Sequence, residues 1–334
     1  MVDSHTSLTF AQAFEDTEKE LKNNLPPWEK ASFSDKILII VIKAIILFPV
    51  VVVLFIVAAT YGIYIAFYAI PILRDNDDRP EVYYWHSDSE RNAAEIRTFI
   101  ILAVLTWNVF WLLFSLYKAS WTDPGEIPKI PEWEILLEDS SESGTDKITI
   151  EKRKDGSLRT CNHCQLKKPD RCHHCKQCDR CNLKMDHHCN WIANCVGNYN
   201  YKYFFLVVFY GAFSLILFVA TFWETVVVGL CDNDNSEFFM LFVVTVYALG
   251  ILLAIAVVGF MLFHLWLIWN GYTTIEFCEK KRGKVANFAK SPYTQGTMNN
   301  YKEALGNNVW LWLLPFGYEK SKDSGLHFTT KNIN

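Results

Sequence analysis

The sequence lacks an excess of basic residues and an apolar stretch near its beginning, and each absence excludes a class of protein. Lysine and arginine total 32, against 36 aspartates and glutamates, so the formal net charge is −4. Because proteins that bind nucleic acid usually carry a basic surface, we expect no nucleic-acid partner. The first residues are polar and acidic, whereas a secretory signal peptide starts basic and soon turns apolar. We therefore expect no secretory leader at this end.

Cysteine is scarce outside a single stretch, residues 161–195. Disulfide frameworks are typical of small secreted domains, whereas cysteines clustered with histidines in a long chain indicate metal binding in a reducing compartment. Several of these cysteines follow one another at C-x2-C spacing, which suits tetrahedral zinc sites. The stretch holds eight of the ten cysteines and five of the nine histidines: Cys161, Cys164, Cys172, Cys175, Cys178, Cys181, Cys189 and Cys195, with His163, His173, His174, His187 and His188.

Charged residues are nearly missing from four long stretches, 37–73, 98–117, 203–230 and 238–269. A helix needs about 20 apolar residues to cross a bilayer, so each stretch is long enough to span a membrane. The first is longer than necessary, and its crossing part is predicted at 47–71. Four helices buried in a soluble core are the alternative, but runs this long and this free of charge argue against it.

The distribution of lysine and arginine orients these helices. The connection 118–202 holds 14 of them and the region 270–334 holds nine, whereas 74–96 holds three and 231–237 holds none. Positive charge accumulates on the cytosolic side, so we expect the cysteine-rich connection and both termini there. The predicted organisation is a cytosolic arm at 1–36, two membrane helices within 37–117, a cytosolic connection at 118–202, two further membrane helices within 203–269, and a cytosolic region at 270–334.

The order of the motifs is specific. The central stretch reads Cys161-x2-Cys164, Lys168-Pro169-x-Arg171, His174-Cys175-x2-Cys178-x2-Cys181 and Asp186-His187-His188-Cys189, followed by Cys195. Asp123-Pro124-Gly125 follows the second apolar stretch, and Thr273-Thr274-x-Glu276 and then Asn300 follow the fourth. This arrangement resembles the DHHC protein S-acyltransferases, or palmitoyltransferases, over roughly residues 37–317. One departure is Asn190, where the family usually has proline, and we expect it to modify activity rather than abolish it.

The resemblance implies an all-α polytopic membrane protein with four transmembrane helices and a cytosolic two-zinc domain of small β-hairpins. Eight cysteines and five histidines exceed the eight ligands that two closed zinc sites need, so spacing alone leaves the pairing open. The family pattern implies Cys161, Cys164, His174 and Cys181 for one structural zinc, and Cys175, Cys178, His188 and Cys195 for the other. Cys172 and Cys189 then remain as free thiols.

Three neighbouring residues predict a Cys-His-Asp arrangement. Cys189 is expected to be the nucleophile, His187 the base that takes its proton, and Asp186 the carboxylate that orients the imidazole. The alternative makes all four DHHC residues ligands of a plain zinc module, which leaves the surplus ligands and the membrane helices unexplained. By resemblance, Thr274 is a candidate hydrogen-bond partner of Asp186, and Asn300 is expected to brace the active site.

Acyl-CoA is the co-substrate that the resemblance implies. Lys168, Arg171 and His173 are expected to bind its phosphates; a solvated run of charge is the alternative. Trp191 is expected at the membrane surface. The acyl tail is expected to contact Phe204 and Val207, and to end near Ser214, about 15 Å deeper than Phe204 on roughly the same helix face. The alternative for Ser214 is that it faces lipid or bonds to its own helix backbone.

The predicted function is transfer of a palmitoyl or similar long acyl group from CoA, through an acyl-cysteine on the enzyme, to cysteines of proteins. The expected partners are the lipid bilayer and proteins with membrane-proximal cysteines. The expected location is the endomembrane system (Golgi, endoplasmic reticulum or plasma membrane), with a cytosolic active site. Two other classes remain as alternatives: a membrane-anchored zinc adaptor without turnover, and a nucleic-acid-binding zinc module, against which charge and membrane burial argue.

Overall fold

The computed structural model describes residues 26, 29–74, 87–130, 133, 150–153, 155–231, 237–281, 291–318, 320 and 324–328. Most of the predicted arm at 1–36 lies outside these ranges, as does most of the predicted turn at 231–237. The chain divides into two compact units. One comprises residues 1–53, 124–198 and 323–328, and the other comprises 54–123, 199–322 and 329–334.

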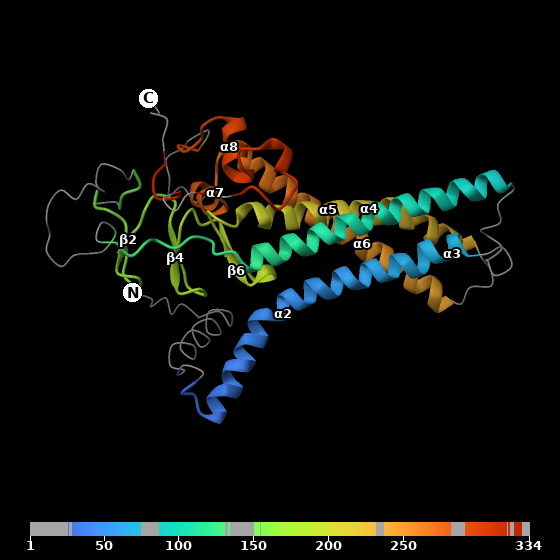
Figure 1. Cartoon of the computed structure of the whole chain (residues 1–334), viewed down its shortest axis with the longest axis horizontal. Coiled ribbons are helices and arrows are strands. Elements are labelled where there is room, and N and C mark those ends of the chain that lie inside the picture. Colours follow the sequence, from blue (N-terminus) through green and yellow to red (C-terminus); the bar gives the residue numbers. More distant parts are fainter. Residues whose placement is uncertain are drawn as a thin grey trace, which may run out of the picture. The chain divides into compact units, whose positions relative to one another are not determined.

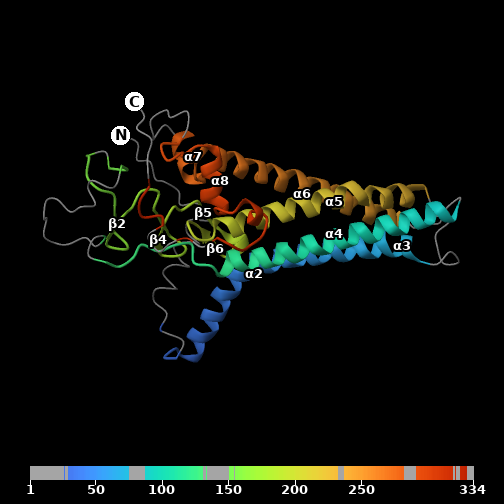
Figure 2. The same ribbon diagram turned by 45° about the horizontal axis from the view of Figure 1, so that its top comes forward.

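Within the described residues, four helical stretches are long and apolar enough to cross a membrane, which confirms the predicted fold class. The first begins as α2 (Phe33–Tyr64) and continues through a π-helical turn, η1 (Ile65–Ala69), into α3 (Ile70–Leu73). The others are α4 (Asp88–Trp121), α5 (Tyr201–Cys231) and α6 (Glu237–Asn270). In the helical unit α5 packs against both α4 and α6, and these helices run side by side in both ribbon views (Figures 1 and 2).

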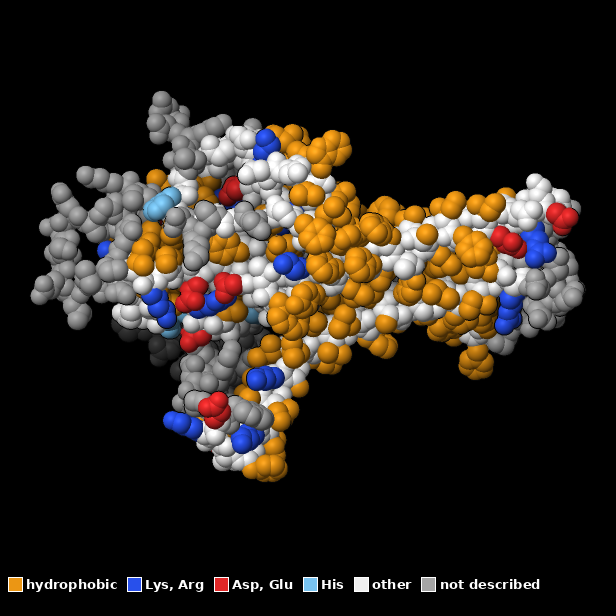
Figure 3. Space-filling model, viewed as in Figure 1, with side chains coloured by type: hydrophobic (Ala, Val, Ile, Leu, Met, Phe, Trp, Pro, Cys, Tyr) orange, Lys and Arg blue, Asp and Glu red, His pale blue; other side chains and the backbone are white. Residues whose placement is uncertain are grey.

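Aromatic side chains fill the core at one end of this bundle. Tyr64 and Tyr68 pack with Phe218 and Phe222 of α5, and the Tyr64 hydroxyl lies 2.8 Å from the hydroxyl of Thr221. Hydrophobic side chains also cover the outside of the helices, and charged side chains gather at their ends (Figure 3). A bundle that is apolar on both its inside and its outside suits lipid as its surroundings.

Polar contacts between α4 and α5 occur at two levels. Near the start of α4, the Arg97 guanidinium donates to both carboxylate oxygens of Glu224, at 2.9 and 2.8 Å. Farther along, the buried amide of Asn108 donates to the Tyr210 carbonyl at 3.0 Å and to the Ser214 hydroxyl at 2.6 Å. Such bonds fix the register of two apolar helices, because sliding one helix would leave these groups unpaired away from water.

In the part of the cysteine-rich unit that the structure describes, there are three two-stranded antiparallel sheets, in agreement with the predicted small hairpins. β1 (Thr160–Cys161) pairs with β2 (Leu166–Lys167), and β3 (His173–Cys175) pairs with β4 (Arg180–Asn182). β5 (His187–Cys189) pairs with β6 (Asn194–Val196). A modest apolar cluster supports the unit and consists of Ile127, Trp133, Leu166, Leu183 and Leu326 together with Cys161, Cys172 and Cys181.

The region after α6 adds short helices to the helical unit. α7 (Thr274–Lys281) follows α6 almost directly, and α8 (Thr297–Leu305) leads into a single 3-10 turn, η6 (Val309–Leu311). Thr273 and Glu276 form a reciprocal cap at the start of α7: the Thr273 N–H donates to the Glu276 carboxylate, and the Glu276 N–H donates to the Thr273 hydroxyl. The T-T-x-E motif is therefore a capping box.

Candidate active site and metal centres

Strand alternation separates the metal ligands from the predicted catalytic residues. Successive side chains of a strand point to opposite faces. In β5, His187 and Cys189 therefore share one face, and His188 takes the other. His188 lies opposite Cys195 of β6, so these two predicted ligands of one metal form a cross-strand pair. In the same way His174 of β3 lies opposite Cys181 of β4, whereas the neighbouring Cys175 points the other way.

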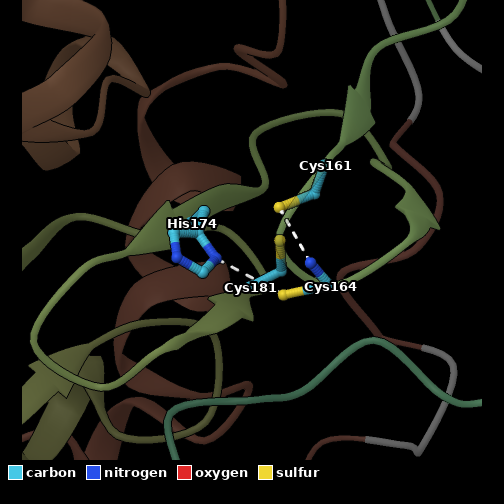
Figure 4. Close-up of side chains that lie close together, drawn as sticks. All are labelled: Cys161, Cys164, His174 and Cys181. Carbon is cyan, nitrogen blue, oxygen red and sulfur yellow. Dashed lines mark hydrogen bonds between the residues drawn. The ribbon is translucent and has the colours of Figure 1, made fainter. Parts of the chain in front are cut away.

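The first Cys/His cluster consists of Cys161, Cys164, His174 and Cys181, whose ligand atoms all lie within 4.8 Å of one another. Figure 4 shows the three sulfurs and the imidazole gathered around a common centre. The Cys164 Sγ lies 3.3 Å from the His174 Nδ1, and the Cys164 N–H points to the Cys161 Sγ at 3.5 Å. On the far side of the ring, a carboxylate oxygen of Asp179 lies 3.6 Å from the His174 Nε2.

The second cluster consists of Cys175, Cys178, His188 and Cys195, again within 4.8 Å. The His188 Nδ1 lies 3.5 Å from each of the three sulfurs, and the sulfurs of Cys178 and Cys195 are 3.5 Å apart. Both groupings are the two ligand sets that the family resemblance implies, so that expectation is confirmed at the level of metal-binding clusters.

The donor sets fit zinc. Tetrahedral zinc with bonds of about 2.0–2.3 Å places neighbouring ligand atoms about 3.3–3.8 Å apart, and the observed separations of 3.3–3.5 Å match. Three thiols and one imidazole nitrogen in each cluster are the soft ligands that zinc prefers. Both clusters have the four donors of a closed structural site.

Cys172 is a fourth sulfur beside the first cluster but is not one of its ligands. Its side chain is fully buried, and a hydrogen bond joins it to Cys181. Enclosure by apolar neighbours fits the interpretation of Cys172 as a buried thiol.

The predicted catalytic residues come together at the start of β5. The Asp186 carboxylate is buried and lies 2.7 Å from the His187 Nδ1. The His187 ring also has a hydrogen bond with the Cys189 thiol. Burial by itself would lower the pKa of His187, but the hydrogen bonds to Asp186 and Cys189 outweigh it and raise the pKa to about 9. Carboxylate, imidazole and thiol thus form a continuous chain.

A short turn follows the Cys189 thiol. Asn190 is the first residue of a 3-10 helix, Asn190–Ile192, and its carbonyl accepts from the Ala193 N–H at 3.0 Å. The first position of a helical turn is one that proline favours, so the same backbone path suits the residue that the family usually has. Asparagine at this position is compatible with the turn.

The outer motifs have local structural roles. In the cysteine-rich unit the Gly125 carbonyl accepts from the Leu183 N–H at 2.8 Å, so the D-P-G motif leads into the β-hairpin module. In the helical unit the buried Asn300 amide donates to the Trp269 carbonyl and to the Thr294 hydroxyl, and its oxygen accepts from the Gln295 N–H. Asn300 therefore ties α8 to the end of α6.

The predicted CoA-binding residues differ in environment. Lys168 is half-buried, whereas Arg171 is buried, with its guanidinium 5.2 Å from the centre of the Phe328 ring. Burial, together with the positive charge of Arg159, lowers the pKa of His173 to about 4, so His173 is neutral at neutral pH. Arg171 and His173 thus contribute less exposed positive charge than the sequence suggested.

The predicted acyl contacts lie on two sides of α5. The Phe204 ring packs on His264 and Phe260 of α6, whereas Ser214 bonds to Asn108 of α4. The expectation of a shared face is wrong, because ten residues of an α-helix fall about 80° short of three turns. Val207 packs against a cluster that includes Trp111 of α4. Trp191 is 58% exposed.

Sequence reasoning missed two interactions: the bond between Asn108 and Ser214, and the helix cap formed by Thr273 and Glu276. Asn108 interrupts the apolar stretch of α4, and a lone amide within a membrane helix was the available signal that it meets a polar group on another helix. The spacing of Thr273 and Glu276 matches the S/T-x-x-E pattern of a capping box, so the pattern could have predicted that a helix begins there.

We expect His188→Ala to remove one of two bound zinc ions and to lower the thermal stability of the cysteine-rich unit, because each cluster joins segments far apart in sequence. Zinc per chain is measured by elemental analysis, and stability by thermal unfolding. His187→Ala is the matched control, since it alters the neighbouring residue on the opposite strand face and should retain both ions. Full zinc content in the His188 variant would refute the ligand assignment.

Comparison with known proteins agrees with this geometry. Residues 154–281 match the family described as DHHC palmitoyltransferase. Probable protein S-acyltransferase 13 of Arabidopsis thaliana is 31% identical over 244 residues, which cover 70% of this chain and 79% of the relative. Probable protein S-acyltransferase 14 of the same plant is 35% identical over 234 residues, covering 65% and 69%. Palmitoyltransferase ZDHHC15A of Danio rerio is 36% identical over 208 residues, covering 60% and 58%. The chain therefore belongs to the DHHC palmitoyltransferases, a family of multi-pass membrane protein S-acyltransferases.

Proposed function

We propose that this enzyme transfers a long acyl group, such as palmitoyl, from acyl-CoA to cysteines of proteins through an acyl-enzyme formed on Cys189. The observation that carries the proposal is the chain of Asp186, His187 and Cys189 on one side of β5. The two clusters take up His188, the other histidine of the D-H-H-C motif, together with six other cysteines. Cys189 is therefore a thiol outside the metal sites with a base beside it.

In the first step His187 takes the thiol proton of Cys189, and the Asp186 carboxylate stabilises the imidazolium. The thiolate sulfur attacks the thioester carbonyl carbon of acyl-CoA. The bond between that carbon and the CoA sulfur breaks, and the leaving CoA thiolate takes the proton back from His187. The products are S-acylated Cys189 and free CoA, with no change in oxidation state.

In the second step the thiol of a protein substrate attacks the acyl-Cys189 carbonyl. His187 accepts the substrate's proton and returns it to the Cys189 sulfur as the new thioester forms. The two zinc ions, when bound, hold the strands in place. The reaction itself uses the residues of β5 and the residue before it.

The side of the membrane on which the active site lies determines which acceptor cysteines it can reach. Lysine and arginine are concentrated in the cysteine-rich connection and in the C-terminal region, which supports a cytosolic active site. Proteins with cysteines close to the cytosolic face of the Golgi, endoplasmic reticulum or plasma membrane are the proposed acceptors. Lys168, which is half-buried, is the remaining candidate for contact with the CoA phosphates, and the exposed Trp191 is the candidate for contact with the membrane surface. A hydrogen bond from Thr274 to Asp186 remains a proposal.

Cys189→Ser should abolish autoacylation and transfer while the zinc content stays at two per chain. A serine hydroxyl is far harder to deprotonate than a thiol, and Cys189 is not among the cluster residues. Labelled palmitoyl-CoA followed by gel analysis measures both activities. Cys172→Ser is the matched control: it keeps Cys189 and should therefore still undergo autoacylation. Autoacylation of the Cys189 variant at the wild-type level would refute the proposed mechanism. A wild-type protein that never becomes acylated would instead favour the alternative of a membrane-anchored adaptor without turnover.

His187→Ala should slow autoacylation by about 10²–10⁴-fold, the usual scale for general acid–base assistance. The fold should survive, since His187 is not in either cluster. Rapid-quench measurement of the acyl-enzyme gives the rate, with zinc content as the check on folding. A rate equal to that of the wild type would move the base role to another residue.

Ser214→Phe should shift the preference from chains of about 18 carbons to shorter ones. The small Ser214 side chain contacts Asn108 of α4, so it points into the bundle rather than only at lipid, and a phenyl ring there would occupy space at that depth. Competition among acyl-CoAs of graded length measures the profile. Ser214→Ala is the control for loss of the Asn108 bond without added bulk. An unchanged profile in the phenylalanine variant would show that the acyl tail does not end here.

A further inference from the structure

The segment 309–316, between α8 and Gly317, lies along the membrane helices although it forms only one 3-10 turn. The ring of Phe316 meets the rings of Trp111 and Phe114 of α4, with centroids 5.6 and 5.7 Å apart. Leu314 packs against a cluster formed by α4 and α5. These contacts are all within the helical unit.

Side chains of α5 satisfy the carbonyl groups of this segment. The Lys202 ammonium is fully buried and donates to the carbonyls of Leu311 and Phe316, both at 2.7 Å. The Tyr210 hydroxyl donates to the carbonyl of Leu313. Non-helical backbone is tolerated at membrane depth only where such groups are paired, because the hydrocarbon offers no water to bond them. The segment meets that condition at three carbonyls.

Four apolar side chains of the segment are exposed. Trp310 is 90% exposed, and Val309, Leu313 and Phe316 are each close to half exposed. In water this would be a costly apolar surface. Tryptophan with aliphatic and aromatic neighbours is instead typical of the boundary between headgroups and hydrocarbon.

The depth of the contacts can be measured along the helices. The Arg97–Glu224 ion pair joins α4 and α5 near the start of α4. Because charged side chains are costly within hydrocarbon, this ion pair lies at or outside the edge of the hydrocarbon at that end of the helices. Trp111 is fourteen residues from Arg97, and Tyr210 is fourteen residues from Glu224. At 1.5 Å per residue both lie about 21 Å from the ion pair. The hydrocarbon is about 30 Å thick, so these contacts fall inside it.

We propose that residues 309–316 insert into the bilayer leaflet at the C-terminal end of α4, as a membrane anchor held by Lys202 and Tyr210. The occupant of the exposed face is lipid: Trp310 and Leu313 contact acyl chains and headgroups directly. The buried ammonium serves the fold, since it pairs two carbonyl groups that a regular helix would otherwise pair internally. The inference concerns how the region after α8 is attached and does not depend on the transfer reaction.

Photocrosslinking in lipid nanodiscs tests this anchor. The full chain carries p-benzoylphenylalanine in place of Trp310, and lipid adducts are counted by mass spectrometry after irradiation. Trp107, exposed in the middle of α4, is the lipid-facing reference position, and the exposed Asn299 of α8 is the aqueous one. Trp310 should give lipid adducts at a level similar to Trp107 and about tenfold above Asn299, as a bilayer-inserted residue requires.

A yield at Trp310 no higher than at Asn299 would overturn the proposal, and so would crosslinks from Trp310 to a second copy of the chain instead of lipid. Lys202→Met tests the clamp. It should lower the adduct yield at Trp310 severalfold while the yield at Trp107 in the same variant stays unchanged, which shows that the bundle is intact. An unchanged yield at Trp310 in that variant would refute the role of Lys202.

Discussion

The strands of the cysteine-rich unit are too short to hold a fold by themselves. Each has two or three residues, and a two-stranded sheet of that size is unstable alone in water. Metal coordination by the two Cys/His clusters would supply the cross-links that a larger core would otherwise provide, and metal binding would then be part of the folding free energy. The arrangement of the active site depends on these clusters, because they determine where β5 lies.

The second metal cluster and the proposed active site are directly adjacent in sequence. His188 is a cluster ligand and Cys189 is the next residue, so the metal site fixes the backbone that carries the thiol. Cys195 fixes the opposing strand at the register position of His188. His187 then shares a face with Cys189 without competing for the metal. A change to the second cluster would therefore displace His187 and Cys189, the residues to which the proposed mechanism assigns the proton transfer and the attack.

The sequence was sufficient for features that depend on composition or spacing. Four charge-poor stretches predicted α2 with α3, α4, α5 and α6, and the cysteine spacing together with the family pattern predicted both ligand sets. It was insufficient where packing decides. A basic residue such as Arg171 reads as exposed, yet the fold encloses it against Phe328. Phe204 and Ser214 looked aligned along one helix face, but the helical angle directs them toward different neighbours. The buried role of Lys202 was equally hidden, since its partners are backbone carbonyls of a distant segment.

The interleaving of the two clusters also sets an order for events on the ribosome. The ligands of the first cluster are complete when Cys181 has been made, whereas those of the second wait for Cys195, fourteen residues later. At ordinary rates of synthesis that interval is about 1–3 s. During it, Cys175 and Cys178 lack the complete ligand set of their cluster. The ligands of the first cluster are thus synthesised before the last ligand of the second, and the membrane helix that begins at Tyr201 follows that ligand by only six residues.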